Sequence, residues 1–400
     1  MKILHTSDWH LGHKLYGYDR TEEQQAFLHQ IAVIVKAHQP DVMIVSGDVF
    51  DIGNPATEVQ KMYVDALLHI RAQKQDMPIV ITAGNHDSYS RIEVNRMLWK
   101  MAGVYMVGNM AHHADRSADY EPHVIRIGDK GFVAAVPFCY EQNFPQVPEG
   151  VAESRQGHFF RKLLDVIDAQ NHNGLPVVLM AHLAVTGCDI TGHRDNVGGM
   201  EYTPLDQLGT GYDYLALGHI HRPQFVEGGD RKARYSGAPV AVSFDEAYPH
   251  SVSIVEIDRH GETPRCTPIE IINPHPLVTL PVNGALPFDE TLALLRDFDA
   301  EKAAYIRLNV LSDNGYLLPD CTERALEICR NKACKFCYVN RIIAEEKENE
   351  IAQPTVTIRE IKEMSDDKII DIAFRYHGLN EEQRDMLRQV IQLVNTEDKI

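Results

Sequence analysis

Five short polar motifs, each directly after an apolar run typical of a β-strand, constrain this 400-residue chain more than any other feature. They are Asp8-Trp9-His10, Gly47–Asp51, Gly84–Asp87, Ala181-His182 and Gly218–His221. Because ligands of α/β sheets gather at the carboxyl ends of strands, the five motifs can converge on one crevice. Their glycines permit the tight turns needed there. The pattern therefore predicts a layered α/β fold with a single polar site.

Apolar runs and amphipathic stretches of helical period alternate between these motifs. The expected strands are 2–6, 41–46, 78–83, 104–107, 124–127, 131–136, 176–181, 214–217 and 252–257. The expected helices are 22–38, 57–73, 92–100 and 154–171. Interleaved strands and helices predict a sandwich of β-sheets flanked by helices, which we assign to a first domain over residues 1–272.

A proline-rich stretch that begins at residue 273 marks a predicted domain boundary. Beyond it, an expected helix (289–297), strand (304–311), helix (320–331) and strand (335–343) indicate a small α+β domain over residues 273–345. The C-terminal segment, residues 346–400, carries two amphipathic stretches (358–376 and 380–394) that are typical of helices. Such an end suits docking into the groove of a partner, and packing on the chain's own body is the alternative.

The charge balance restricts the choice of partners. Against 39 Lys and Arg stand 57 Asp and Glu, a net charge of −18, which argues against a protein that binds polyanions by bulk charge. Binding of nucleic acid would need a local basic patch, metal ions or a partner. Neither a signal peptide nor a run of ~18 apolar residues is evident, so we expect a cytoplasmic protein.

The side chains that the five motifs bring together are carboxylates, an amide and several imidazoles, the donor set of a cluster of divalent metals. Residues two apart, such as Asp8 and His10 or His219 and His221, can reach the same side of an extended segment. Asp48 would leave its strand as a carboxylate able to bridge two ions. Two metals ~3.5–4 Å apart can stabilise the attacking and leaving oxygens of a phosphate ester during hydrolysis. Histidines outside the motifs are interpreted as packed or solvated side chains: His5, His29, His38 and His69.

In this order, D-x-H, G-D-x-x-D, G-N-H-D, a lone histidine and G-H-x-H resemble the signature of the calcineurin-type metallophosphoesterases. The resemblance implies that one ion is held by Asp8, His10 and His221, and the other by Asn85, His182 and His219. It also implies that Asp48 bridges the ions. His86 is then the proton donor or transition-state stabiliser, with Asp87 as a plausible partner that holds its imidazole. For Asp51, a direct role and a turn or supporting role stay equally open.

Longer motifs, among them Asp8–His13, Leu217–Arg222, Tyr235–Pro239 and Ser243–Glu246, resemble the SbcD family of double-strand-break repair nucleases. The resemblance implies an Mn²⁺-dependent (or Mg²⁺-dependent) DNA phosphodiesterase with two metal ions. It also implies 3′→5′ cutting of duplex ends, cutting of hairpins and single strands, and a role in DNA repair, recombination and replication at the nucleoid. The implied partner is SbcC, an SMC-like ATPase that consumes the ATP. A homodimer of this chain would join SbcC in a heterotetramer. The small domain would cap the site and select DNA, and the C-terminal helices would bind the coiled coil of SbcC. One departure is Ile52, where related archaeal and eukaryotic enzymes carry a histidine.

Weaker signals concern DNA contacts and cysteines. Basic side chains in loops near the metal motifs are candidate phosphate contacts: His13, Lys14, Arg20, Arg91 and Arg194. Scattered solvated surface is the alternative. Four cysteines crowd into 17 positions (Cys321, Cys329, Cys334 and Cys337), but their irregular spacing favours small buried side chains over a zinc site.

Two other functions remain to be weighed against the nuclease. A metallophosphoesterase for small nucleotides or phosphoproteins would use the same five motifs, but it does not require a second domain and a docking tail. An adaptor without catalysis would lack a metal ligand, and none of the seven is missing from the sequence.

Overall fold

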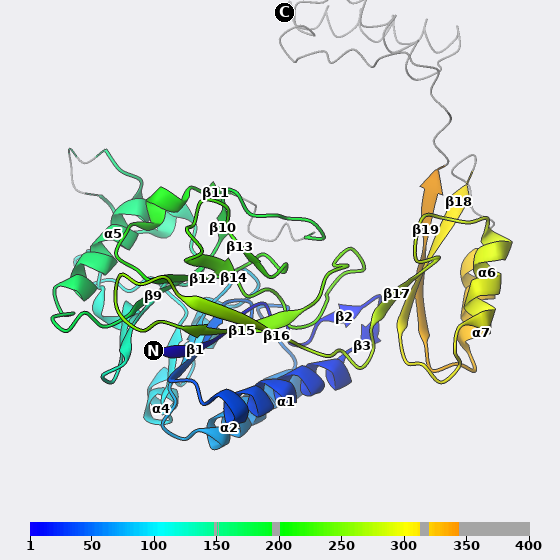
Figure 1. Cartoon of the computed structure of the whole chain (residues 1–400), viewed down its shortest axis with the longest axis horizontal. Coiled ribbons are helices and arrows are strands. Elements are labelled where there is room, and N and C mark those ends of the chain that lie inside the picture. The colour runs from blue at the N-terminus through cyan, green and yellow to red at the C-terminus, as the bar shows by residue number, and fades with distance from the viewer. Residues whose placement is uncertain (148–149, 151, 194–200, 313–319, 344–400) are drawn as a thin grey trace, which may run out of the picture. The chain divides into compact units, whose positions relative to one another are not determined.

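Two six-stranded β-sheets lie face to face in the computed structural model, which describes residues 1–147, 150, 152–193, 201–312 and 320–343 (Figure 1). The first sheet has the order β16 (Arg265–Glu270), β15 (Ser251–Glu256), β1 (Lys2–Thr6), β4 (Val42–Ser46), β5 (Ile79–Thr82) and β6 (Val104–Val107). The second has the order β13 (Gln224–Phe225), β14 (Ala233–Tyr235), β12 (Tyr214–Gly218), β9 (Val177–His182), β8 (Gly131–Ala135) and β7 (Val124–Ile127). The central strands of each sheet run parallel, so their carboxyl ends share one edge.

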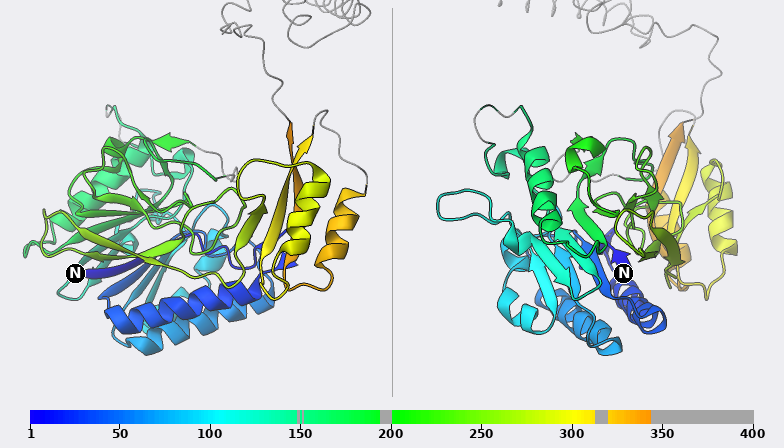
Figure 2. Two further views of the ribbon diagram at one scale, coloured as in Figure 1. Left: turned by 45° about the vertical axis from the view of Figure 1, so that its right-hand side comes forward. Right: turned by 60° about the vertical axis from the view of Figure 1, so that its left-hand side comes forward.

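The alternation of side chains along each strand separates three hydrophobic layers. In β1 and β4, Ile3 and Ile44 pack between the sheets against side chains such as Val178. Their neighbours Leu4 and Met43 point to the other face, where α1 (Thr21–His38) and α2 (Thr57–Gln73) cover the first sheet. The helix α5 (Arg155–Asp168) covers the outer face of the second sheet (Figure 2). The predicted α/β sandwich flanked by helices is therefore confirmed as four layers, and the nine expected strands are present within one or two residues.

Several local features differ from the sequence-based expectation. The single helix expected at 92–100 is two short helices, α3 (Tyr89–Ile92) and α4 (Arg96–Met101), because Asn95 adopts a left-handed conformation with φ 61°. Short elements that the periodicity did not indicate are β2 (Lys14–Leu15), β3 (Tyr18–Asp19), β10 (Ala184–Val185), β11 (Tyr202–Thr203), β13, β14, η1 (Glu121–His123), η2 (Glu141–Asn143) and η3 (Leu205–Leu208). Two-residue strands carry too little pattern to be recognised in a sequence.

A further, three-stranded sheet follows the sandwich, with β18 (Tyr305–Ser312) between β17 (Leu277–Leu280) and β19 (Lys335–Ile343). All three strands are parallel, and α6 (Phe288–Asp297) and α7 (Cys321–Cys329) connect them. The helices pack on one face of the sheet around their own hydrophobic core. The sequence pattern did not indicate β17. Because β17 pairs in parallel with β18, the unit consists of β-α-β repeats rather than the α+β arrangement that we expected.

The described residues contain no helix that is long and apolar enough to cross a membrane. The two helices expected at 358–376 and 380–394, together with Arg194, lie outside the described residues.

Candidate active site

The five sequence motifs meet where the two sheets present the carboxyl ends of their parallel strands. Backbone hydrogen bonds fasten the first two loops to each other, since Asp8 N–H donates to Gly47 O (3.0 Å) and His10 N–H donates to Asp48 O (3.1 Å). The second sheet joins through the Nδ1–H of His182, at the end of β9, which donates to the carbonyl oxygen of Ser46 at the end of β4 (2.8 Å). Residues far apart in the sequence are thereby held at one edge of the sandwich.

Asp8, His10 and His221 form one compact group, in which the three potential ligand atoms all lie within 4.8 Å of one another. The Nε2 atoms of His10 and His221 are 3.1 Å apart. The Nδ1–H of His221 donates to the carboxylate of Glu246 (2.9 Å), so the Nε2 of the neutral ring presents a lone pair to His10. Two imidazole nitrogens that face each other in this way fit a cation between them.

Asn85, His182 and His219 form the second group. Asn85 Oδ1 lies 2.8 Å from His182 Nε2 and 2.9 Å from His219 Nδ1. Because His182 gives its Nδ1–H to Ser46, the Nε2 that faces the Asn85 oxygen is an acceptor in the neutral ring. An acceptor nitrogen and an acceptor oxygen this close suit a shared metal ion.

Asp48 lies between the two groups. Its Oδ2 atom is 3.7 Å from His10 Nε2 and 3.4 Å from His182 Nε2, so it reaches toward one ligand of each group. This oxygen is completely buried and has no hydrogen-bond partner among the described residues, whereas Oδ1 accepts from the backbone N–H of His86 (2.9 Å). An unpartnered, buried carboxylate oxygen is costly unless a cation satisfies it. The seven residues therefore fit a dinuclear metal site with Asp48 at its centre.

The electrostatics of the group favour positive charge. Burial alone would lower the pKa of His182, but the Asp48 carboxylate raises it to about 9. Burial also opposes ionisation of Asp48, yet the surrounding imidazoles, His182 first, bring its pKa well below the usual range. Glu246 acts on His221 in the same way and raises the pKa of that imidazole to about 9. The site is thus built to hold cations against carboxylates in a dry setting.

His86 stands beside the first group, with its ring 4.8 Å from the ring of His10 and nearly perpendicular to it. Its Nδ1–H donates to the backbone carbonyl of Asp51 (2.8 Å). Asp87 does not hold this imidazole, which corrects the expectation from the sequence. Its buried carboxylate instead accepts from the backbone N–H groups of Val49, Phe50 and Gly84 (3.1, 2.9 and 2.9 Å). Asp87 fastens the second and third motif loops together, a contact that residue spacing alone does not reveal.

Asp51 and Glu246 each contact a residue of the first metal group from outside. Asp51 Oδ1 lies 3.5 Å from His10 Nδ1, and the two form a further cluster of potential ligands with His86. Glu246, whose Oε1 accepts from His221, belongs to one of the longer motifs but was not predicted as a site residue. A third neighbour, His193, stacks its ring edgewise 5.3 Å from His219 and 5.1 Å from His221. No spacing rule connects Glu246 or His193 to the five motifs, so sequence patterns do not reveal them.

The candidate DNA contacts are placed differently from one another. Lys14 and Arg91 are exposed, while His13 is half-buried and its pKa falls to about 4, chiefly through burial. Arg20 is only 2% exposed. Its guanidinium donates to Ala241 O (2.6 Å) and Glu23 (3.3 Å) and lies 5.7 Å from the centre of the Tyr305 ring. These internal partners argue against a phosphate contact by Arg20.

The cysteines of the small unit lie in its core rather than around a metal. Cys329 and Cys334 are buried, with their sulfurs 3.8 Å apart, and Cys337 packs against a separate aromatic cluster. Among the residues that the structure describes, no three cysteines gather within reach of one ion. The contacts support the interpretation of these side chains as small buried hydrophobes.

The chain is similar to known proteins. Residues 1–223 match the model of the calcineurin-like phosphoesterase family. The chain is 35% identical to the SbcD subunit of the SbcCD nuclease of Rhodobacter capsulatus over 74% of this chain and 75% of that protein. It is 30% identical to the SbcD subunit of Bacillus subtilis over 70% and 71%, and 33% identical to that of Escherichia coli over 62% of each chain. The chain therefore belongs to the calcineurin-like phosphoesterases and, within them, to the SbcD family of nucleases.

Proposed function

We propose that this protein is an Mn²⁺-dependent DNA phosphodiesterase that works as the nuclease subunit of an SbcCD-type complex. One observation carries the proposal: seven donor side chains from five loops converge in two adjoining groups, with the unpartnered oxygen of Asp48 directed between them. Each related protein named above is the SbcD subunit of an SbcCD nuclease, which supports DNA as the substrate and SbcC as the partner.

In this proposal, Asp8, His10 and His221 hold one ion, Asn85, His182 and His219 hold the other, and Asp48 bridges them. Two bound ions would supply an activated water and neutralise charge on the phosphate. His86 stands next to this site. Because the Asp51 carbonyl accepts from its Nδ1–H, its Nε2 is the atom that would donate a proton to the departing sugar oxygen or stabilise the transition state. Asp51 and Glu246 hold the rings of His10 and His221 in place.

The substrates that we propose are duplex ends cut 3′→5′ with ATP consumed by SbcC, hairpins and single strands. The enzyme would then act at the nucleoid in the cytoplasm, in repair, recombination and replication. We propose that residues 273–345 select DNA and that residues 346–400 bind the ATPase. The first of these roles is supported by contacts to loops near the site, because Arg307 in β18 pairs with Asp245 (2.8 Å), the neighbour of Glu246. Tyr18 also donates its hydroxyl to Phe336 O in β19 (2.8 Å).

The test is cutting of end-labelled duplex and hairpin DNA by the full chain with Mn²⁺, with and without a coiled-coil ATPase and ATP. Asp48→Ala removes the carboxylate that would bridge the two ions, so the stabilisation they give the transition state is lost. Since each 1.4 kcal/mol of lost stabilisation is tenfold, the rate should fall at least about 100-fold. Its circular dichroism should stay native. Asp65→Ala, at an exposed position of α2, is the matched control and should cut at the rate of the unaltered protein. Retained Mn²⁺-dependent cutting by Asp48→Ala would overturn the site assignment. Turnover of nucleotides or phosphopeptides without any cutting of DNA would favour a small-substrate phosphoesterase instead.

A further inference from the structure

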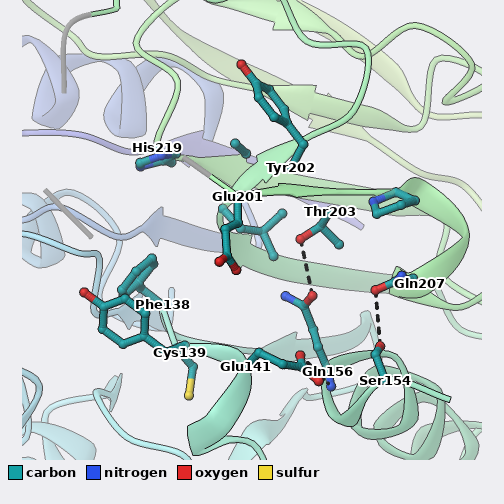
Figure 3. Close-up of a pocket in the computed structure, with 14 residues that line it drawn as sticks. Phe138, Cys139, Glu141, Ser154, Gln156, Glu201, Tyr202, Thr203, Gln207 and His219 are labelled. Carbon is teal, nitrogen blue, oxygen red and sulfur yellow. Dashed lines mark hydrogen bonds between the residues drawn. The ribbon is translucent and has the colours of Figure 1, made fainter. Parts of the chain in front are cut away.

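A pocket of about 310 Å³ opens beside the second metal group, with His219 in its lining (Figure 3). This volume is at the lower end of the ~300–1,000 Å³ range of small-ligand sites. Its lining comes from five places in the chain: the segment after β8, the start of α5, the segment after β9, β11 with η3, and His219 after β12. No sequence motif except that of His219 points to this region, and the metal chemistry uses only His219 from it.

Aromatic rings connect the pocket with the metal site. The ring of Phe138 lies edgewise 6.3 Å from the ring of His182, and Tyr140 lies edgewise 5.1 Å from Phe138. Tyr202 in β11 also belongs to the lining, but its ring points to the side of the strand opposite to Thr203 (Figure 3). Tyr140 is 45% exposed, so its ring is accessible to a ligand in the pocket. Exposed aromatic side chains of this kind are platforms on which nucleobases stack.

Two amide groups in the pocket are oriented by hydroxyl donors. Ser154 Oγ accepts from Gly157 N–H (3.0 Å), so its hydroxyl hydrogen is left to donate to Gln207 Oε1 (3.2 Å). Thr203 donates to Gln156 Oε1 in the same way (3.3 Å). With both oxygens used as acceptors, each side chain has its –NH₂ group left to donate. Among the described residues, neither of these nitrogens has a hydrogen-bond partner.

The charge of the pocket excludes a phosphate group as its occupant. Its ionisable lining residues besides the tyrosines, His219 and Cys139 are Glu141 and Glu201, and none of the described residues in the lining is a lysine or arginine. The Glu141 carboxylate accepts from the backbone N–H groups of Arg155 and Gln156 at the start of α5. Its negative charge interacts favourably with the positive end of the helix dipole there. A strand held by its phosphate on the metal ions would therefore place an uncharged part here. A planar ring with acceptor atoms at its edge matches the exposed Tyr140 ring and the two amide donors.

We propose that this pocket holds an unpaired nucleobase of the nucleotide next to the scissile phosphate. The inference rests on the proposed function and deepens it, because it defines the substrate as a strand whose terminal or looped-out base has left its stack. A base that remains paired and stacked within a duplex cannot enter a pocket between aromatic side chains. Hairpin loops, single strands and frayed ends satisfy this requirement directly, and an intact duplex end satisfies it only after unpairing.

The experiment compares two single-stranded, end-labelled oligonucleotides that differ in one nucleotide, which is intact in one and an abasic tetrahydrofuran residue in the other. The full chain with Mn²⁺ should cut the phosphates next to the abasic residue roughly tenfold more slowly, the effect of losing one base–aromatic stack. Tyr140→Ala should reduce this ratio toward one by slowing the intact substrate. Tyr140→Phe keeps the ring and should keep the ratio, as should Tyr89→Ala, an exposed tyrosine outside the pocket.

Gln207→Glu tests the amide donor, because the shape and the oxygen that accepts from Ser154 are kept while the –NH₂ is lost. It should slow cutting next to the intact nucleotide and leave the rate at the abasic residue unaltered. Equal rates on both oligonucleotides for the unaltered protein would overturn the pocket proposal, as would an unchanged ratio in Tyr140→Ala. If no oligonucleotide is cut while bis(p-nitrophenyl) phosphate is hydrolysed, the proposed DNA function fails rather than the pocket.

Discussion

At the scale of single residues, the metal site is held in a backbone conformation that its amino acids do not prefer. Asp8, His10, Asp48 and His219 have positive φ values of 52°, 43°, 49° and 97°. Each such residue costs on the order of 1–3 kcal/mol and persists only where surrounding contacts impose it. Two sets of contacts do so: the backbone hydrogen bonds between the loops of Asp8 and Asp48, and the hydrogen bonds that the Asp87 carboxylate accepts from Val49 and Phe50. Strain at four of the seven predicted ligands indicates that the loops are shaped for the site rather than for the fold.

Glu246 is the residue whose role is most directly testable at this scale. Its carboxylate accepts from His221 Nδ1 (2.9 Å) and is buried, so it fixes the ring that completes the first metal group. Loss of such an outer partner typically weakens metal binding by about 10–100-fold. We expect Glu246→Gln to raise the half-saturating Mn²⁺ concentration by that factor in calorimetric titrations. Glu227→Gln, an exposed glutamate outside the metal groups, is the control. Unaltered Mn²⁺ affinity in Glu246→Gln would contradict this positioning role.

His5 links the fold to pH. It is completely buried, and its Nδ1 lies 2.8 Å from the Tyr214 hydroxyl. Burial, with a smaller contribution from Arg234, lowers its pKa from 6.5 to about 3. The unfolded chain therefore binds a proton below pH 6.5 that the folded chain takes up only near pH 3, and stability falls as the pH decreases through this window. From pH 6.5 to 5 the loss should be about 2 kcal/mol, at ~1.4 kcal/mol per pH unit. Urea unfolding with a chelator present measures it, and His5→Gln should show a shallower dependence. An identical slope in the variant would refute the assignment to His5.

At the scale of elements, the predictable parts are those with a long, consistent pattern. Strands such as β4, in which every residue is buried, were evident because both faces of the sheet are covered. β16 was missed because it lies at a sheet edge and most of its residues are exposed, which leaves no apolar run. The helix break at Asn95 was missed because asparagine only permits the left-handed conformation and does not require it.

The candidate site divides in the same way. The seven side chains that the sequence predicts as ligands lie together because each follows a strand, and parallel strands end at a common edge. The loops determine the remaining contacts. Glu246 reaches His221 across 25 residues of sequence, and Asp87 turns to the backbone of another motif although His86 is its neighbour. Such contacts depend on where a loop folds back, which neither periodicity nor spacing specifies.

At the scale of the whole molecule, the net charge of −18 takes on a different meaning. Asp8 and Asp48 belong to a site that two divalent cations would convert into a binding site for phosphate. The pocket beside it is acidic as well, which suits an uncharged base and not a backbone. In the proposed function, the attraction for DNA is therefore placed at the metal ions.

An exposed apolar patch bears on the homodimer that the resemblance to the SbcD family implies. It consists of Leu68 on α2 with Val94, Met97, Leu98 and Met101 on and before α4, and each of these side chains is more than half exposed. It adjoins a groove between the two helices that is lined by Leu67, Leu68 and Trp99, and exposed apolar patches of this kind often mark interaction surfaces. A second copy of this chain that presents the same patch would cover it, since two-fold interfaces are self-complementary.

We expect the full chain to elute in size-exclusion chromatography with light scattering at twice the mass of one chain. Leu98→Glu places a charge in the centre of the patch and should shift the mass to that of one chain, because burial of an unpaired carboxylate opposes association. Val282→Glu alters a side chain of comparable exposure that lies after β17, away from the patch, and should leave the dimer intact. A single-chain mass for the unaltered protein, or an unaltered dimer in Leu98→Glu, would show that this patch does not join two copies. The circular dichroism of Leu98→Glu should remain native, since Leu98 contributes little to the core in the monomer.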